Sequence, residues 1–194
     1  MRKRDGVTAP SVSQLEDELK RVRHKRRYSS VLRSTVYTLV VVAAVSVLVA
    51  TLWLPVLQVY GRSMEPSLSE KEIVVSVKTN ELKSGDIVAF YYNNKILVKR
   101  VIGGPGQWVD MDEDGTVYVD REKLEEPYIL EKALGECDVE FPYQVPEARW
   151  FVMGDHRATS VDSRSSALGC VAEEQIVGTI VFRVWPLSRF GTVE

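Results

Sequence analysis

The segment YGRSMEPSL, residues 60–68, places Ser63 in a short stretch that glycine and proline interrupt. Serine is common in turns, and it can also cap a helix or accept a phosphate group, so these two interpretations stay open. The third interpretation is chemical. A serine hydroxyl attacks a carbonyl carbon when a neighbouring base accepts its proton, and that base is usually histidine and, in a minority of designs, lysine.

Lys99 is one candidate for that base. In ILVKRVI, residues 96–102, period-two alternation puts Lys99 and Arg100 on opposite faces of a predicted strand, each among aliphatic side chains. We expect one of the two cations to lie at an edge or to extend towards solvent. The other then lies in apolar surroundings, where burial disfavours a charged ammonium group and a lysine can act as a neutral general base.

Histidine is the other candidate base, and the sequence contains two, His24 and His156. His24 precedes a long apolar segment and His156 follows it, so only His156 could approach Ser63. A Ser/His pair therefore depends on His156 alone, whereas a Ser/Lys pair depends on Lys99.

The apolar segment lies between Arg33 and Arg62 and contains no charged residue. A helix rises about 1.5 Å per residue, so this segment is long enough to cross a hydrocarbon layer of about 30 Å. A cleaved signal peptide has a shorter apolar segment and a much shorter polar leader. We therefore expect residues 34–59 to form a permanent transmembrane helix.

Charge predicts the orientation of this helix. Residues 1–33 carry ten basic and four acidic side chains, a net charge of +6, whereas the whole chain has a net charge of −2. Basic flanks stay on the cytoplasmic side, so we expect residues 1–33 to be a cytoplasmic leader and residues 60–194 to lie outside the plasma membrane. Beside a membrane helix, the basic cluster favours anionic lipid headgroups as its partner, and we expect no nucleic acid partner.

The residues after the apolar segment predict a mainly β domain. Short β-branched or aromatic segments alternate with turn signals such as KSGD, NN, GGPG and DEDG. An all-β barrel or folded sheet over residues 60–194 follows, and the acidic segment 124–148 is expected to be a solvated surface loop. The expected strands are residues 73–77, 87–92, 96–102, 116–119, 150–153 and 176–184.

Cys137 and Cys170 both fall in the part of the chain expected outside the membrane, where disulfides persist. A disulfide between them and two free thiols are both compatible with the sequence. Neither cysteine has surroundings comparable to those of Ser63, so neither is a candidate nucleophile. No Cys/His cluster has the spacing of a metal site, and we expect neither a metal nor another cofactor.

Three motifs follow the apolar segment in the order GRSMEPSL, ILVKRVIGGPG and GDHRATSVDSR. This arrangement resembles type I signal peptidase of the Gram-positive kind, a membrane-bound Ser/Lys endopeptidase that removes signal peptides from exported preproteins. The resemblance extends from the apolar segment to near the C-terminus. It implies a single transmembrane helix followed by an extracytoplasmic β-barrel-like catalytic domain of the type shared with self-cleaving repressors.

The resemblance implies roles for individual residues. Ser63 matches the nucleophile, Lys99 matches the general base, and Ser160 matches the serine that orients the base. Gly61 stands where some members have a serine that donates to the oxyanion, which implies that backbone N–H groups, including that of Ser63, carry more of this stabilisation. His156 stands where asparagine is common, and in histidine-dependent relatives the histidine instead replaces the lysine.

The resemblance also implies supporting residues around this pair. Asp162 and Arg164 match an ion pair near the site, and Arg100 matches a structural partner of the base. Gly154 and Asp155 match positions that shape the adjacent strand and turn.

The substrates implied by the resemblance are preproteins delivered by the secretion translocon and cleaved after small residues in an Ala-X-Ala pattern. Residues 73–77 and the segment just before Lys99 are candidates for the pocket walls, and equally for plain core. We expect a monomer in the lipid bilayer. Two other functions stay open: a catalytically silent, membrane-tethered module that binds signal peptides or surface and pilus proteins, and a self-cleaving repressor, which would need a DNA-binding domain in place of the apolar segment.

Overall fold

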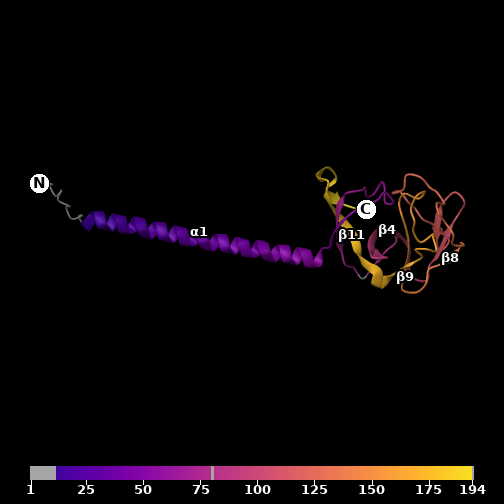
Figure 1. The fold of residues 1–194 in the computed structure, drawn as a ribbon, viewed down its shortest axis with the longest axis horizontal. Helices are drawn as coiled ribbons and strands as arrows, with labels where there is room; N and C mark the ends of the chain where they lie inside the picture. The colour runs from indigo at the N-terminus through magenta and orange to yellow at the C-terminus, as the bar shows by residue number, and fades with distance from the viewer. Residues whose placement is uncertain (1–11, 80, 194) are drawn as a thin grey trace. The chain divides into compact units, whose positions relative to one another are not determined.

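The computed structural model describes residues 12–79 and 81–193, without the side chains of residues 25, 26 and 49–53. The chain divides between Val49 and Ala50 into two units, which are considered separately. The first unit contains most of a single helix, and the second contains all of the β structure (Figure 1).

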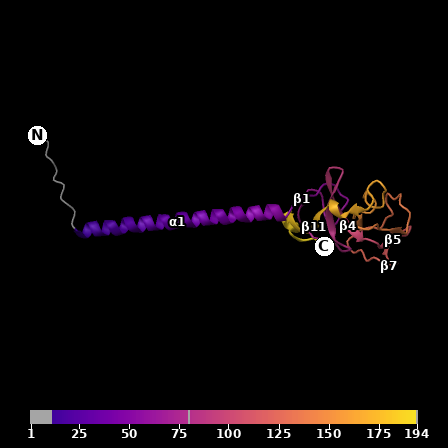
Figure 2. The same cartoon turned by 90° about the horizontal axis from the view of Figure 1, so that it is seen from below.

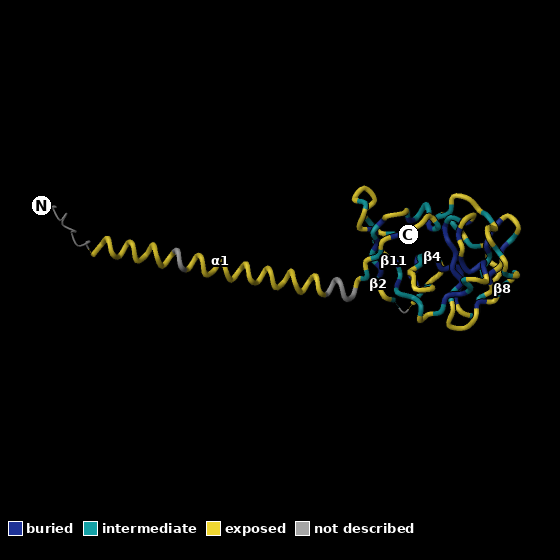
Figure 3. Tube along the Cα trace, in the orientation of Figure 1, coloured by how far each residue is buried: buried dark blue, intermediate teal, exposed yellow. Residues whose placement is uncertain are grey.

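Helix α1 runs from Val12 to Trp53. It is therefore continuous through the described part of the basic leader and through most of the apolar segment. Its described side chains are exposed along the helix (Figure 3). By length and composition, the stretch Val12–Leu48 is a candidate to cross a membrane.

The helix ends before the expected limit at residue 59. Pro55 has no N–H to donate and disfavours a helical conformation at the residue before it, so the helix ends at Trp53. Strand β1, Val56–Gln58, follows and pairs antiparallel with β2, Ile73–Val77. Val59 is buried in the β unit. The last residues of the expected transmembrane helix are thus part of the β structure.

The β unit consists of two antiparallel sheets. The first has the order β1-β2-β11-β3-β4-β9-β10, with β12 paired to β11, and the second has the order β7-β6-β5-β8. Two views at right angles place β5, β7 and β8 towards one end of this unit and β1 and β11 towards the other (Figures 1 and 2). The bounds in the first sheet are Ile73–Val77 (β2), Ile87–Tyr92 (β3), Lys95–Gly103 (β4), Arg149–Met153 (β9), Val171–Ala172 (β10), Ile176–Trp185 (β11) and Gly191–Thr192 (β12). Those in the second are Trp108–Met111 (β5), Val117–Val119 (β6), Glu122–Lys123 (β7) and Tyr143–Gln144 (β8), and two short 3-10 turns occupy Glu173–Gln175 (η1) and Leu187–Arg189 (η2).

The prediction of a mainly β domain is confirmed. Each of the six expected segments contains a strand, and β2 and β3 have the expected bounds. The sequence does not predict β1, whose residues were expected in the helix, or the short strands β5, β7, β8, β10 and β12. These strands are two to four residues long, too short to show a period-two pattern.

The core of the β unit is formed by three clusters of buried apolar side chains. Buried residues occur in this unit along several segments of the chain (Figure 3). One of the clusters contains Met64 and Leu68, which follow Ser63 in the chain, together with Val74 of β2 and Ile180 of β11. The segment that carries Ser63 is therefore attached to the sheet by its own buried side chains.

Strand β4 has two different edges. Its pairing with β3 extends from Lys95 to Arg100, but its pairing with β9 begins only at Arg100. Because β9 ends at Met153, residues 95–99 are unpaired on that side among the residues that the structure describes. The first sheet is thus open beside Lys99.

Both cysteines are free thiols, Cys170 buried and Cys137 half-buried. The sequence is compatible with a disulfide and with two free thiols, and the structure has two free thiols.

Candidate active site

A cavity of about 490 Å³ lies beside the unpaired part of β4. Ser63 and Lys99 both line it, and they come from segments far apart in the sequence. Most of the remaining wall is apolar, and it includes the segment just before Lys99, as expected. Residues 73–77 do not line it, because the inward side chains of β2 belong to the core. The lining residues are Leu57, Gln58, Val59, Tyr60, Gly61, Ser63, Met64, Lys95, Ile96, Leu97, Val98 and Lys99.

The Lys99 side chain is buried, with 4% of its surface exposed. Its Nζ donates a hydrogen bond to the Ser160 Oγ at 2.9 Å. Burial lowers the pKa of Lys99 to about 8; the charge of Arg164 acts in the same direction, whereas Asp162 and Asp155 oppose the shift. At mildly alkaline pH a large fraction of this lysine is neutral, and a neutral amine has a lone pair that can accept a proton.

Ser160 lies in the turn between β9 and β10, and this turn also contacts the nucleophile segment. The backbone N–H of His156 donates to the Ser63 carbonyl at 3.0 Å. At Gly154, where β9 ends, a Cβ atom would collide with Ser160 Oγ and would lie 2.5 Å from the Ser63 carbonyl oxygen. Only glycine leaves room for both serines at this point, which is why Ser63 and Ser160 can approach each other.

Asp162 and Arg164 form a fully buried ion pair in the same turn, with Nη2 and Oδ2 2.8 Å apart. Asp162 Oδ2 also accepts from the N–H of Gly154, at 2.9 Å. Burial alone would raise the pKa of Asp162, but the hydrogen bonds and charge of Arg164, the Gly154 amide and the Ser160 hydroxyl hold it below its ordinary value. The pair therefore stays ionised and connects the end of β9 to the turn that carries Ser160.

Arg100 corrects one expectation. The strand pattern predicts one of the two neighbouring cations at an edge or in solvent, but Arg100 is buried as deeply as Lys99. Its guanidinium makes a bidentate contact with Asp155, at 2.9 and 2.8 Å, so the buried charge is paired. Nη2 also donates to Ser67 Oγ at 3.0 Å. Arg100 thereby connects β4 to both the Ser160 turn and the nucleophile segment.

Two further arginines hold the nucleophile segment from the C-terminal side. The Ser67 carbonyl accepts from Arg183 at 2.5 Å and from Arg189 at 3.5 Å. Both arginines pair with the buried carboxylate of Glu72. The sequence predicts no role for any of the three, because these charged residues lie outside the three motifs and their partners are distant in the chain.

Gly61 and His156 contribute through their backbones. Gly61 has φ of +83°, a conformation that favours glycine, and it lines the cavity two residues before Ser63. The His156 ring Nδ1 is 2.9 Å from the Thr159 hydroxyl, and His156 lines a separate cavity of about 110 Å³ that does not include Ser63. The contact of His156 with Ser63 is made by its amide, so the geometry favours Lys99 over His156 as the base.

The acidic segment 124–148 is only partly the solvated loop that was expected. Leu130 is exposed, but the Glu126 side chain is only 3% exposed and pairs with the fully buried Arg157. The ring of Tyr128 lies 3.8 Å from the Arg100 guanidinium carbon. Glu126 and its neighbour Glu125 look alike in the sequence, so no local signal could have identified the buried one.

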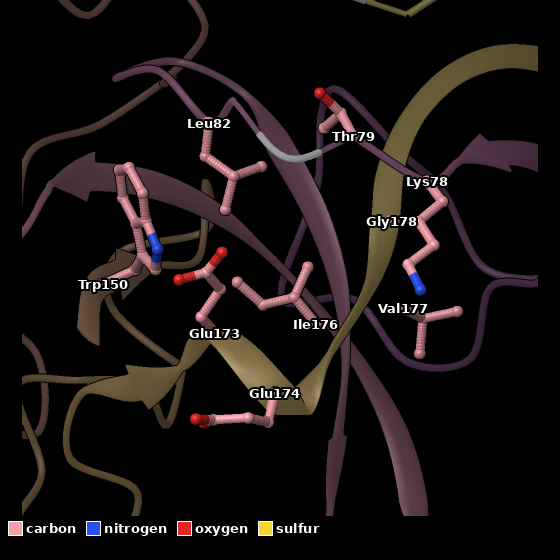
Figure 4. Close-up of a pocket in the computed structure, with 9 residues that line it drawn as sticks. All are labelled: Lys78, Thr79, Leu82, Trp150, Glu173, Glu174, Ile176, Val177 and Gly178. Carbon is pink, nitrogen blue, oxygen red and sulfur yellow. The ribbon is translucent and has the colours of Figure 1, made fainter. Parts of the chain in front are cut away.

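A second cavity, of about 270 Å³, lies between the end of β2, the start of β11 and β9. Figure 4 shows Trp150, Leu82 and Ile176 around the carboxylate of Glu173. None of the expected site residues lines this cavity. Its other lining residues are Lys78, Thr79, Glu174, Val177 and Gly178.

Comparison with known proteins identifies the family. The family model described as signal peptidase, peptidase S26, matches residues 32–185. Signal peptidase IB of Staphylococcus aureus (strain COL) is 39% identical over 151 residues, which cover 67% of this chain and 77% of the relative. Signal peptidase I T of Bacillus subtilis (strain 168) is 40% identical over 144 residues, which cover 68% and 74%.

Among solved structures, a signal peptidase I from Enterococcus faecalis V583 matches 52% of this chain and 97% of its own, with 29% identity and a TM-score of 0.42. The matched family region contains Ser63, Lys99 and the Ser160 turn. The chain therefore belongs to the signal peptidase family, peptidase S26, and is a serine endopeptidase of the signal peptidase I type.

Proposed function

We propose that this protein is a membrane-anchored endopeptidase that removes N-terminal signal peptides from exported preproteins, with Ser63 as nucleophile and Lys99 as general base. One observation carries the assignment of the pair: a buried lysine, bonded to Ser160 and with its pKa lowered to about 8, lines the same apolar cavity as Ser63. Family membership supports signal peptide removal, since the relatives named above are signal peptidases.

The proposed reaction proceeds in two stages. Neutral Lys99 accepts the hydroxyl proton of Ser63 while Ser63 Oγ attacks the scissile carbonyl, and Lys99 then gives this proton to the leaving amine. The product is an acyl-enzyme. In the second stage Lys99 accepts a proton from water while the water oxygen attacks the acyl carbonyl. The bond between Ser63 Oγ and the signal peptide then breaks, and Lys99 returns the proton to Ser63 Oγ.

Ser160 and the backbone of the nucleophile segment support both stages. The Lys99 Nζ donates one hydrogen bond to Ser160, which orients the amine while its lone pair stays available. The negative charge that develops on the carbonyl oxygen needs hydrogen-bond donors. We assign this role to backbone N–H groups that include that of Ser63, because Gly61 offers no hydroxyl.

The shape of the cavity supports cleavage after small residues. The unpaired edge of β4 offers backbone donors and acceptors at residues 95–99, so an extended substrate can add there as a further strand. Alternate side chains of such a strand point into the wall formed by Val59, Ile96 and Val98. We propose that this wall accommodates alanine-sized side chains at the first and third positions before the cut.

Helix α1 supports the membrane assignment. It contains a stretch long and apolar enough to cross a bilayer, preceded by basic residues. We propose a single transmembrane helix in the plasma membrane, with the N-terminus in the cytoplasm and the β unit on the outer side. A substrate whose own apolar segment is still in the bilayer would then meet the enzyme at the membrane surface.

The test uses the full-length protein in liposomes and a preprotein with an Ala-X-Ala site. Cleavage at the expected bond should be abolished in Ser63→Ala and Lys99→Ala and retained in His156→Ala, with products identified by mass spectrometry. Loss of cleavage in His156→Ala with retention in Lys99→Ala would transfer the base to His156. Binding of the preprotein without cleavage by the parent protein would favour the silent binding module.

A further inference from the structure

Glu126 is a buried carboxylate to which the proposed reaction assigns no role. It belongs to the acidic segment outside the three family motifs, and its side chain is 3% exposed. Its two oxygens contact side chains from two directions, Arg157 and Tyr128. Burying a carboxylate is costly unless it is paired, so these contacts determine where Glu126 can lie.

The first contact leads to the Ser160 turn. The Arg157 side chain is fully buried, and it forms an ion pair with Glu126 in which both carboxylate oxygens accept. Arg157 Nε also donates to the Gly154 carbonyl at 3.1 Å. The Arg157 carbonyl accepts from Arg164 at 2.9 Å. Glu126 is thus joined through Arg157 to both ends of the turn that carries Ser160.

The second contact leads to β4. The Tyr128 hydroxyl donates to Glu126 Oε1 at 3.1 Å, and the Tyr128 ring lies against the Arg100 guanidinium. Burial, together with the charge of Glu126, raises the pKa of Tyr128, so the hydroxyl keeps its proton and remains a donor. Arg100 is the chain neighbour of Lys99 and contacts Asp155 and Ser67.

We infer that Glu126 is a positioning residue that holds the Ser160 turn against the Lys99 strand, an inference that rests on the proposed function. The pairing of β4 with β9 ends at Arg100 and Met153 and does not include Lys99 or the residues after Met153, so sheet hydrogen bonds do not set the position of Ser160 relative to Lys99. Glu126 contacts Arg157 of the turn and, through Tyr128, Arg100 of the strand. It lines no part of the cavity beside Ser63, so it acts on the reaction and not on substrate binding.

The test is Glu126→Gln in the full-length protein, which keeps the size of the side chain and removes its charge. Buried Arg157 then loses its ionised partner, and the Ser160 turn is no longer held at its hydrogen-bond distance from Lys99. We expect kcat for the preprotein to fall ~10- to 100-fold while KM changes less than about twofold, because small misplacements of reacting groups have large effects on rate. Glu126→Asp, which keeps the charge, should recover part of the lost kcat.

One matched control and one milder variant complete the design. Glu125→Gln makes the same change at an exposed neighbour and should leave kcat and KM unchanged. Tyr128→Phe removes only the hydroxyl, so kcat should fall by about threefold, the effect of one lost hydrogen bond. Circular dichroism at the assay temperature measures the folded fraction, to which every kcat is normalised. If Glu126→Gln does not fold, the normalised kcat of Tyr128→Phe, compared with that of Glu125→Gln, tests the inference, and equal values would contradict it.

Three results would overturn the inference. The normalised kcat of Glu126→Gln could equal that of Glu125→Gln, KM could change while kcat does not, or Glu126→Asp could recover nothing. These failures are distinct from failure of the proposed function. In the latter case the parent protein would not cleave the preprotein, or Ser63→Ala would cleave it as well as the parent does.

Discussion

The surroundings of Lys99 disfavour the protonated, charged form of its amine. Its side chain is buried, its hydrogen-bond partner is a neutral hydroxyl, and the two carboxylates whose charge opposes the lowering of its pKa, Asp162 and Asp155, each pair with an arginine. A lysine that paired directly with a carboxylate would keep its proton and could not act as a base. The arginines Arg164 and Arg100 therefore support the chemistry by satisfying these carboxylates in place of Lys99.

The lowered pKa of Lys99 predicts how activity depends on pH. With the pKa lowered from 10.5 to about 8, the amine is protonated below pH 8 and cannot accept the Ser63 proton, whereas above pH 8 it is mostly neutral. We expect kcat/KM for preprotein cleavage to rise with pH through a midpoint near 8 and then to level off. A pH profile of the full-length protein in detergent measures this.

His156→Ala is the control for the pH profile. The midpoint should not move in this variant, because the ring of His156 bonds to Thr159 and the cavity beside Ser63 does not include this residue. A midpoint near 6.5, the ordinary pKa of histidine, that disappears in His156→Ala would contradict the assignment of Lys99.

Sequence patterns predict Ser63 and Lys99 as site residues because each lies in a motif with local character, a glycine- and proline-bounded segment and a cation in an aliphatic strand, and the structure places both at one cavity. The same reasoning failed for Arg100, because period two shows which face a side chain occupies but not what covers that face. The Arg100 side chain is covered by Asp155 and Tyr128, which lie many residues after it in the chain. Buried ion pairs of this kind depend on long-range contacts that a local pattern does not contain.

The turn from Gly154 to Arg164 is the element that organises the site. It supplies Ser160 as the partner of Lys99, the His156 amide as the donor to the Ser63 carbonyl, and the ion pair of Asp162 and Arg164. Its first residue, Gly154, determines how closely the two serines approach, because a Cβ atom there would collide with Ser160 Oγ and with the Ser63 carbonyl oxygen.

Gly154→Ala should therefore impair the reaction more than it impairs folding. The added methyl group meets Ser160 Oγ and the Ser63 carbonyl, so one of the serines has to move. We expect kcat to fall ~100-fold, with the loss measured by preprotein cleavage. Gly169→Ala is the matched control, since its Cβ meets nothing within 4 Å and its φ of +63° adds only backbone strain. Equal losses of kcat in the two variants would refute this interpretation.

Secondary structure was predictable where an element was long enough to show its own period. β2 and β3 were found with the observed bounds, whereas the short strands of the second sheet were not. The end of α1 was misplaced because residues 56–59 are as apolar as the helix before them. Apolar character predicts removal from water but does not distinguish a bilayer from a protein core, and Val59 is buried in the core.

The charge and apolar character of the N-terminal part of the chain predict its orientation in the membrane. Because residues 1–33 are strongly basic and α1 is long and apolar, we expect the β unit to face the outside of the cell. Protease added to intact spheroplasts should degrade the β unit and leave an N-terminal tag protected, as measured by immunoblotting. Permeabilised spheroplasts provide the control, in which the tag should also be lost.

The opposite protection pattern, with the β unit intact and the N-terminal tag degraded, would reverse the orientation. It would also place the candidate active site away from exported substrates. Protection of both ends in intact spheroplasts would instead indicate that the protein does not cross the plasma membrane.

The unpaired edge of β4 has a consequence for self-association. A free strand edge attracts any other strand, including the same edge of a second copy of the protein, and such pairing would block the cavity beside Ser63. Lys95 is exposed at the start of this edge and lines the cavity. Two copies pairing edge to edge would bring their lysine charges into one interface, which disfavours the pair, whereas an uncharged preprotein segment meets no such repulsion.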